Sequence, residues 1–97
     1  MDKPSVMQDI IWERNPSPEK LEQLGVYDWP VWEKEVSEFP WSYDSSETCY
    51  LLHGRITVTP ETGQPQSFET GDLVTFPAGM QCHWQIHEAV RKHYRFD

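Results

Sequence analysis

The sequence has no long apolar segment, and it has few basic residues and only two cysteines. Its apolar runs are far shorter than the roughly 20 residues that a membrane-spanning helix requires. Met1-Asp2-Lys3-Pro4 opens no hydrophobic signal segment. We therefore expect a cytoplasmic protein with no membrane partner, in which Cys49 and Cys82 are reduced thiols. A disulfide between Cys49 and Cys82 is the alternative.

Charge of one sign is also scarce. The chain has 8 Lys and Arg against 16 Asp and Glu, which gives a net charge of -8. This charge repels phosphate backbones, so we expect no nucleic-acid partner. Leu, Ile, Val and Phe together make up only about a fifth of the residues, near the range of disordered chains. Five Trp and four Tyr add large buriable surfaces, so the 97 residues predict one folded domain with an aromatic-rich core.

Helix signals are confined to an N-terminal arm, residues 1 to 28. Ser17 is a good N-cap, Pro18 suits the first helical position, and Gly25 suits a left-handed stop. Together they predict a short helix over about residues 18 to 24.

The rest of the chain carries strand signals, because β-branched and aromatic residues recur between turn residues. The predicted strands are residues 31 to 39, 47 to 53, 55 to 60, 66 to 69, 73 to 76, 81 to 87 and 90 to 96. An additional edge strand is expected at Ile10-Ile11-Trp12. The short, even spacing of these segments predicts an antiparallel barrel or sandwich.

Alternation along the strands predicts which side chains face inward. Between residues 81 and 87 the inward set is Cys82, Trp84 and Ile86. In the last strand, Lys92, Tyr94 and Phe96 share the more apolar face, whereas Arg91, His93 and Arg95 are expected to be exposed. In the strand that starts at Glu47, both faces carry apolar residues, so one face can line the barrel and the other can pack against a second sheet or a second subunit.

Two motif frames resemble those of the cupin superfamily. Residues 71 to 79, Gly-Asp-Leu-Val-Thr-Phe-Pro-Ala-Gly, resemble the second cupin motif, Gly-x5-Pro-x-Gly. Glu47, six residues and Gly54 resemble the end of the first motif, His-x-His-x3-Glu-x6-Gly. This resemblance implies an all-β fold: a single small cupin, which is an antiparallel double-stranded β-helix or jelly-roll barrel, over residues 29 to 97.

A narrower resemblance is to the small single-domain cupins grouped with the (S)-ureidoglycine aminohydrolase cupin domain. It is carried by Trp29-Pro30-Val31-Trp32, by residues 39 to 43, by Glu47-Thr48-Cys49-Tyr50 and by Arg91-Lys92-His93-Tyr94.

The chain departs from the cupin pattern at the metal ligands. Trp41 and Tyr43 stand where the first motif has its histidines, and Cys82 stands where the second motif has its histidine. Only Glu47 of four family ligands remains. A carboxylate and a thiol are too few ligands for a tight metal site, so we predict no metal ligands and no cofactor beyond weak metal binding.

Glu47, Tyr43 and Cys82 are the candidate catalytic residues. A buried carboxylate requires a partner, and we expect Lys92 or the Tyr43 hydroxyl to supply it in place of the metal. Glu47 is alternatively a buried polar group that only orders the barrel. Cys82 is either a nucleophile on the pocket wall or a small buried apolar side chain.

Trp41, Trp84, Lys92 and Tyr94 are the candidate substrate-binding residues, because they are predicted to line a narrow pocket with a few polar tips. The tryptophans alternatively fill the barrel as core. Of the histidines, His83 and His87 lie about 13 Å apart on one strand, too far for a metal pair. We interpret them as surface residues.

Three functions are compatible with these features. We favour a small-molecule-binding cupin, acting as an enzyme or a binder on a polar metabolite, with Glu47 as acid or base and with Tyr43 and Lys92 as orienting donors. The alternative is a non-catalytic interaction module with a filled barrel that forms a homodimer. The third is a metal-dependent hydrolase or isomerase of the ureidoglycine aminohydrolase type. An open barrel interior separates the first function from the second.

Overall fold

The computed structural model describes residues 10–97, and it shows the predicted helix as α1, Pro18–Leu24. The Ser17 side chain accepts a hydrogen bond of 3.1 Å from the Lys20 backbone amide. At the other end, Gly25 adopts the left-handed conformation with φ of 73°. A single 3-10 turn, η1 (Val26–Asp28), follows directly and leads to the barrel. The capping pattern is therefore confirmed at both ends.

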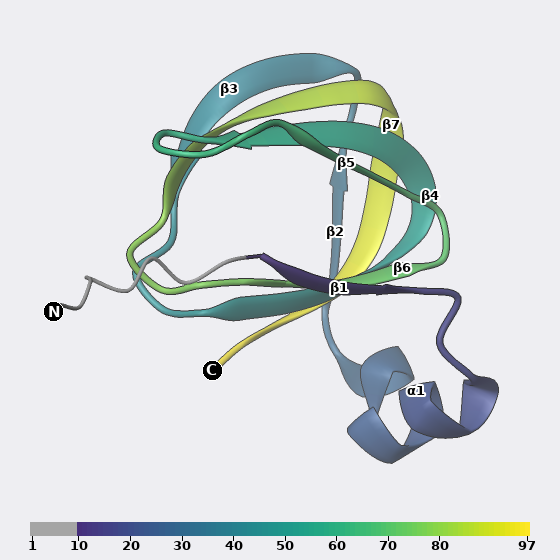
Figure 1. The fold of residues 1–97 in the computed structure, drawn as a ribbon. Coiled ribbons are helices and arrows are strands. Elements are labelled where there is room, and N and C mark those ends of the chain that lie inside the picture. The colour runs from purple at the N-terminus through teal and green to yellow at the C-terminus, as the bar shows by residue number, and fades with distance from the viewer. Residues whose placement is uncertain (1–9) are drawn as a thin grey trace, which may run out of the picture.

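Seven antiparallel strands form one curled sheet (Figure 1). Its order is β1-β6-β4-β7-β2, with β3 also on β7 and β5 also on β4. The strands are β1 (Ile11–Arg14), β2 (Val31–Lys34), β3 (Ser37–Ser42), β4 (Glu47–Pro60), β5 (Gln66–Glu69), β6 (Asp72–Phe76) and β7 (Gln81–Phe96). The predicted all-β antiparallel barrel is therefore confirmed, with β1 as the expected edge strand.

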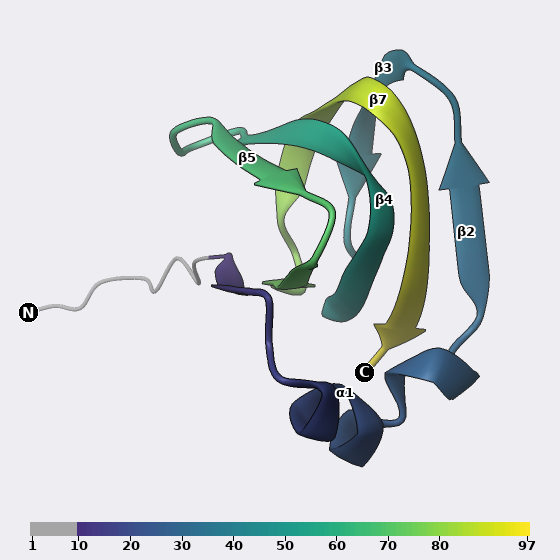
Figure 2. The ribbon, with the colours of Figure 1, turned by 90° about the vertical axis from the view of Figure 1, so that its right-hand side faces the viewer.

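The two long strands, β4 and β7, are the backbone of the barrel. They pair from Glu47 opposite Phe96 to Pro60 opposite Cys82, and they bend together around the interior (Figure 2). The sequence predicted each of them as two strands: β4 as residues 47 to 53 and 55 to 60, with a turn at Gly54-Arg55, and β7 as residues 81 to 87 and 90 to 96. Both predictions were wrong, because the two strands pair with each other on both sides of these positions. Gly54 forms only an irregularity within β4, where the register with β7 shifts between Leu51 and Ile56.

Gly54 has a φ of 125°, and a Cβ there would lie 2.8 Å from the Ala89 carbonyl oxygen. Only glycine therefore lets β4 pass so close to β7.

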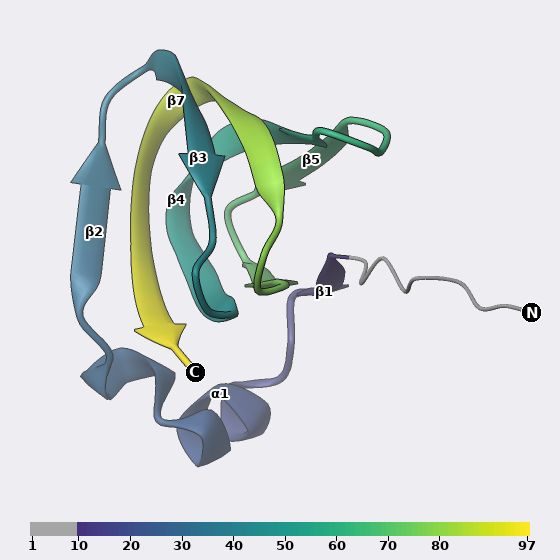
Figure 3. The same cartoon turned by 90° about the vertical axis from the view of Figure 1, so that its left-hand side faces the viewer.

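The opposite error occurred at residues 31 to 39, which were predicted as one strand and form two. β2 pairs with the later half of β7, through Val90 to His93, and β3 pairs with the earlier half, through Gln81 to Ile86. Because β7 curves, its partner bends between the two halves, at residues 35–36 (Figure 3). The Ser37 hydroxyl donates to the Glu35 carbonyl oxygen at 2.8 Å and stabilises this bend.

The interior of the barrel is a cluster of apolar side chains. Cys82, Trp84 and Ile86 are all buried there, as the alternation predicted. Phe76 lies among the aromatic residues, with its ring 5.0 Å from Tyr43 and 5.8 Å from Trp84.

His93 is buried, although the alternation predicted an exposed side chain. Its Nδ1 lies 2.8 Å from the Trp29 carbonyl oxygen, and its ring meets the edge of Tyr27 at 5.6 Å. The segment around η1 therefore covers this face of β7. His83 and His87 are exposed as predicted, and they contact Glu38 and Thr57 respectively. No helix among residues 10–97 is long and apolar enough to cross a membrane.

Candidate functional site

A buried ion pair lies inside the barrel. Glu47 is the first residue of β4, and Lys92 belongs to β7. Lys92 Nζ lies 2.8 Å from Glu47 Oε2, and the two side chains are only 6% and 4% exposed. Of the two predicted partners for Glu47, the structure thus supplies Lys92. Each charge is matched by the other, which offsets the cost of burying them.

The Lys92 ammonium is also held by two indole rings. Nζ lies 4.9 Å from the ring centre of Trp32 and 4.8 Å from that of Trp84. The negative face of an aromatic ring attracts a cation at such distances. The carboxylate and the two rings thus surround the ammonium group and hold it in place.

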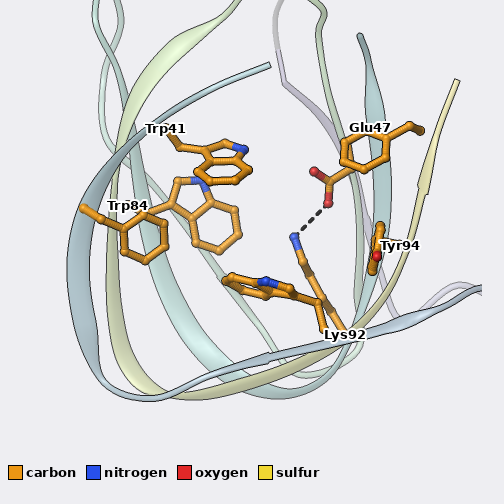
Figure 4. Close-up of a pocket in the computed structure, with 8 residues that line it drawn as sticks. Trp41, Glu47, Trp84, Lys92 and Tyr94 are labelled. Atoms are coloured by element: carbon orange, nitrogen blue, oxygen red, sulfur yellow. Dashed lines mark hydrogen bonds and ion pairs between the residues drawn. The ribbon is translucent and has the colours of Figure 1, made fainter. Parts of the chain in front are cut away.

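A cavity of about 150 Å³ adjoins the ion pair. Glu47 and Lys92 contribute to its lining, and its walls are six aromatic side chains: Trp32, Phe39, Trp41, Trp84, Tyr94 and Phe96. Trp41 and Phe96 are 45% and 54% exposed, so they stand where the cavity meets solvent. Figure 4 shows Glu47 and Lys92 reaching toward each other, with Trp41 and Trp84 across the pocket from Tyr94. The barrel interior is thus open beside the ion pair.

The structure brings together most of the predicted site residues. Glu47, Lys92, Trp41, Trp84 and Tyr94 all line the cavity. Tyr43 and Cys82, however, are not among its lining residues.

Tyr43 lies behind the pocket wall. Its hydroxyl accepts a hydrogen bond of 3.1 Å from Trp84 Nε1, and its ring stacks on Phe76. Burial and the nearby Glu47 charge raise the pKa of the Tyr43 hydroxyl well above its ordinary value, so the hydroxyl stays protonated. Tyr43 fixes the orientation of Trp84 through this hydrogen bond.

Cys82 is also buried, and its thiol donates to the Trp41 carbonyl oxygen at 3.5 Å. Burial raises the pKa of the Cys82 thiol to about 11, and it raises that of Cys49 to about 11 as well. Both cysteines are free, as predicted. A protonated, buried thiol is a poor nucleophile, so the geometry favours the interpretation of Cys82 as a small apolar side chain.

The residues at the cupin ligand positions do not fit a metal ion. Trp41 has no donor atom for a metal, the Tyr43 hydroxyl and the Cys82 thiol are held protonated, and Glu47 is paired with Lys92. Nowhere in residues 10–97 do three or more His, Cys, Asp or Glu side chains gather in a way that could hold a metal ion. The positive charge beside Glu47 comes instead from Lys92.

Sequence reasoning did not single out Trp32, Phe39 and Phe96 as site residues. Trp32 lies opposite Lys92 and Phe39 lies opposite Trp84 in the register of the sheet. Residues 32 and 39 differ by an odd number, so a single strand would point them to opposite faces. The bend at residues 35–36 resets the alternation and turns both rings into the pocket. Phe96 could have been identified from the sequence, because it lies on the same face of the last strand as Lys92.

Comparisons with known proteins agree with this architecture. The profile of the family described as the EutQ-like cupin domain matches residues 21–94. A DUF861 family protein from Thermotoga maritima has a similar structure, with a TM-score of 0.89 and 54% identity, over 92% of this chain and 100% of that one. No curated protein matches the chain.

Two longer proteins share the fold over part of their length. A putative ethanolamine utilization protein Q from Salmonella typhimurium LT2 has a TM-score of 0.60 and 25% identity, over 66% of this chain and 51% of that one. A DUF861 family protein of unknown function from Pseudomonas syringae pv. tomato has a TM-score of 0.60 and 31% identity, over 66% and 28% of the two chains. The family profile and the barrel geometry agree, and the chain belongs to the EutQ-like cupin family.

Proposed function

We propose that this cupin binds a small organic molecule in the aromatic pocket, against the Glu47–Lys92 ion pair and without a metal ion at its centre. The observation that carries the proposal is the open cavity of about 150 Å³ beside a buried ion pair. Apolar cavities of about this size hold a benzene ring. Mostly apolar walls with a few fixed polar groups are typical of small-ligand sites.

The same arrangement supplies the groups for acid-base chemistry. Glu47 is the group that exchanges a proton with a bound molecule, and Lys92 is the adjacent positive charge that stabilises the carboxylate. Tyr43 acts through Trp84 as a positioning residue. In this proposal Cys82 has no chemical role.

The test is a fragment screen by two-dimensional NMR, which resolves the indole N–H signals of the pocket tryptophans. We expect compounds of up to about ten non-hydrogen atoms to shift the Trp32, Trp41 and Trp84 signals in a saturable way. A variant with a bulkier pocket wall, Tyr94→Trp, is expected to weaken this binding, whereas Tyr27→Trp, outside the pocket, is not. If no fragment moves the pocket signals at millimolar concentration, the proposal is wrong.

A non-catalytic homodimeric interaction module with a filled barrel is the second candidate. The open cavity counts against its filled barrel, whereas exposed apolar side chains on the strands and their connections favour the dimer. Ile11 is 70% exposed, Val36 is 62% exposed and Phe96 is 54% exposed. Sedimentation equilibrium measures the mass in solution directly. A dimer that persists at micromolar concentration would support this function, and a monomer would contradict it.

The third candidate, a metal-dependent hydrolase or isomerase of the ureidoglycine aminohydrolase type, requires ligands that Trp41, Tyr43 and Cys82 do not supply. Elemental analysis of untagged protein tests it. A stoichiometric transition metal would support this function, and its absence from protein purified without chelators would count against it.

A further inference from the structure

Glu47 presents an unused oxygen to the pocket. The hydrogen bond from Lys92 ends on Oε2, and no other hydrogen bond to this carboxylate occurs among residues 10–97. Glu47 lines the cavity, and Figure 4 shows its second carboxylate oxygen, Oε1, pointing away from Lys92 and toward the side of the cavity where Trp41 lies. A carboxylate oxygen in that position accepts a hydrogen bond from a ligand.

Lys92, by contrast, has little left to offer a ligand. An ammonium group has three N–H donors. One is directed to Glu47, and the faces of Trp32 and Trp84 lie on two other sides of the nitrogen. Both side chains line the cavity, but the carboxylate has an oxygen left to accept a hydrogen bond there, whereas the ammonium group faces Glu47 and the two rings.

The surroundings add to this negative character. Six aromatic side chains line the cavity, and the negative faces of such rings attract cations. The whole chain carries a net charge of -8, which draws cations and repels anions at long range. A cation bound to Oε1 lies closer to the Glu47 carboxylate than to the Lys92 ammonium group. Its attraction to the carboxylate therefore exceeds its repulsion from Lys92.

We propose that the pocket binds a small organic ammonium ion, whose N–H group donates to Glu47 Oε1 and whose apolar part lies against the ring of Trp41. The cavity volume limits the ligand to about ten non-hydrogen atoms. This inference rests on the proposed function, because it names the chemical class of the ligand for the same pocket.

Three probes of nearly equal size separate the possible charges of the ligand. Benzylamine is a cation at pH 7, benzyl alcohol is neutral, and benzoate is an anion. Calorimetric titrations are expected to give the order benzylamine, benzyl alcohol, benzoate, with several-fold tighter binding at the first step, because hydrogen bonds to charged groups are stronger. NMR shifts of the Trp41 and Trp84 indole signals show whether each probe enters the pocket.

Substitution of Glu47 tests the residue assignment. In the Glu47→Gln protein the preference for benzylamine over benzyl alcohol is expected to fall to about one. Glu38→Gln is the matched control, because Glu38 is an exposed carboxylate on β3 that pairs with His83. If Glu47→Gln alone does not fold, the double variant Glu47→Gln/Lys92→Met removes both charges and is expected to lose the same preference.

The outcomes distinguish the two proposals. If benzoate binds most tightly, Lys92 contacts the ligand and the assignment of an ammonium ion is wrong. If all three probes bind equally well, the pocket recognises only the ring, and the assignment is again wrong, while the proposed function stands. If none of the three shifts the pocket signals, the proposed function itself is contradicted.

Discussion

Lys92 is the residue on which the interior depends, because a carboxylate and two indole rings surround its ammonium group. It provides a positive charge beside Glu47. The other three positions at which the family has metal ligands, 41, 43 and 82, carry no ionised side chain. Unlike a metal ion, this charge is covalently attached to β7. The amine is therefore in place beside Glu47 whenever the barrel is folded.

A double-mutant cycle on the ion pair measures this dependence. Lys92→Met is expected to lower the free energy of unfolding by about 3 to 5 kcal/mol, because it leaves Glu47 buried without a partner. Adding Glu47→Gln to that protein is expected to recover most of the loss. Urea denaturation gives both values. If the two substitutions destabilise the protein additively, the two residues do not act as a pair.

The thiols have a predictable response to pH. Burial raises the pKa of Cys82 to about 11, so its thiolate, the reactive form, is scarce at neutral pH. Modification of Cys82 by iodoacetamide is expected to accelerate about tenfold per pH unit and to level off only near pH 11. Mass spectrometry of a Cys49→Ser protein follows Cys82 alone. A rate that levels off near pH 8 would show an activated thiol instead.

Several single residues were predictable from the sequence because they lie on one regular strand. Parity placed Trp84 inside, and it placed Lys92 on the face of Tyr94. The motif frame placed Glu47 in the barrel, and the cost of an unpaired charge then required a partner such as Lys92. Burial of His93 was not predictable, because it depends on contact with η1, a segment more than 60 residues earlier.

At the scale of elements, Gly54 allows β4 to continue past the Ala89 carbonyl of β7, where a larger residue would clash. Gly54→Ala is expected to lower the free energy of unfolding by at least about 2 kcal/mol, because it adds strain at φ of 125° and a clash with the Ala89 carbonyl. Gly25→Ala is the control. It also has a positive φ, of 73°, but its Cβ would meet nothing within 4 Å, so we expect a cost of about 1 kcal/mol. Equal costs in chemical denaturation would contradict a close approach at Gly54.

The sequence predicted which segments form helix and strand more accurately than it predicted where the strands begin and end. The caps of α1 are local signals, which sequence shows directly, and the prediction was accurate to the residue. Strand limits depend on the partner strand. β4 continues through Gly54, with a shift in register, because β7 pairs with it on both sides of this residue, and the chain bends at residues 35–36 because β7 curves away. Neither cause is visible in the sequence of the affected segment.

At the scale of the whole molecule, the excess of acidic residues acts on any charged ligand. The net charge of -8 is expected to help a cationic probe to bind, and dissolved salt screens this contribution. Raising the salt concentration from 0.05 to 0.5 M is therefore expected to weaken benzylamine binding while leaving benzyl alcohol binding nearly unchanged. Calorimetry at the two salt concentrations provides the comparison. A salt effect of the same size on both probes would show that charge is not its cause.

The long strand β7 has a consequence for the synthesis of the protein. β2, β3 and β4 all pair with β7, and β7 carries Trp84, Lys92 and Tyr94. All three partner strands precede β7 in the chain, so they leave the ribosome first. Until β7 follows, the edges that pair with it remain unpaired. The barrel cannot close, and Glu47 cannot meet its counter-charge, until residues 81–96 have left the exit tunnel. During that interval the excess of acidic residues must keep the exposed edges of the nascent chain from pairing with its neighbours.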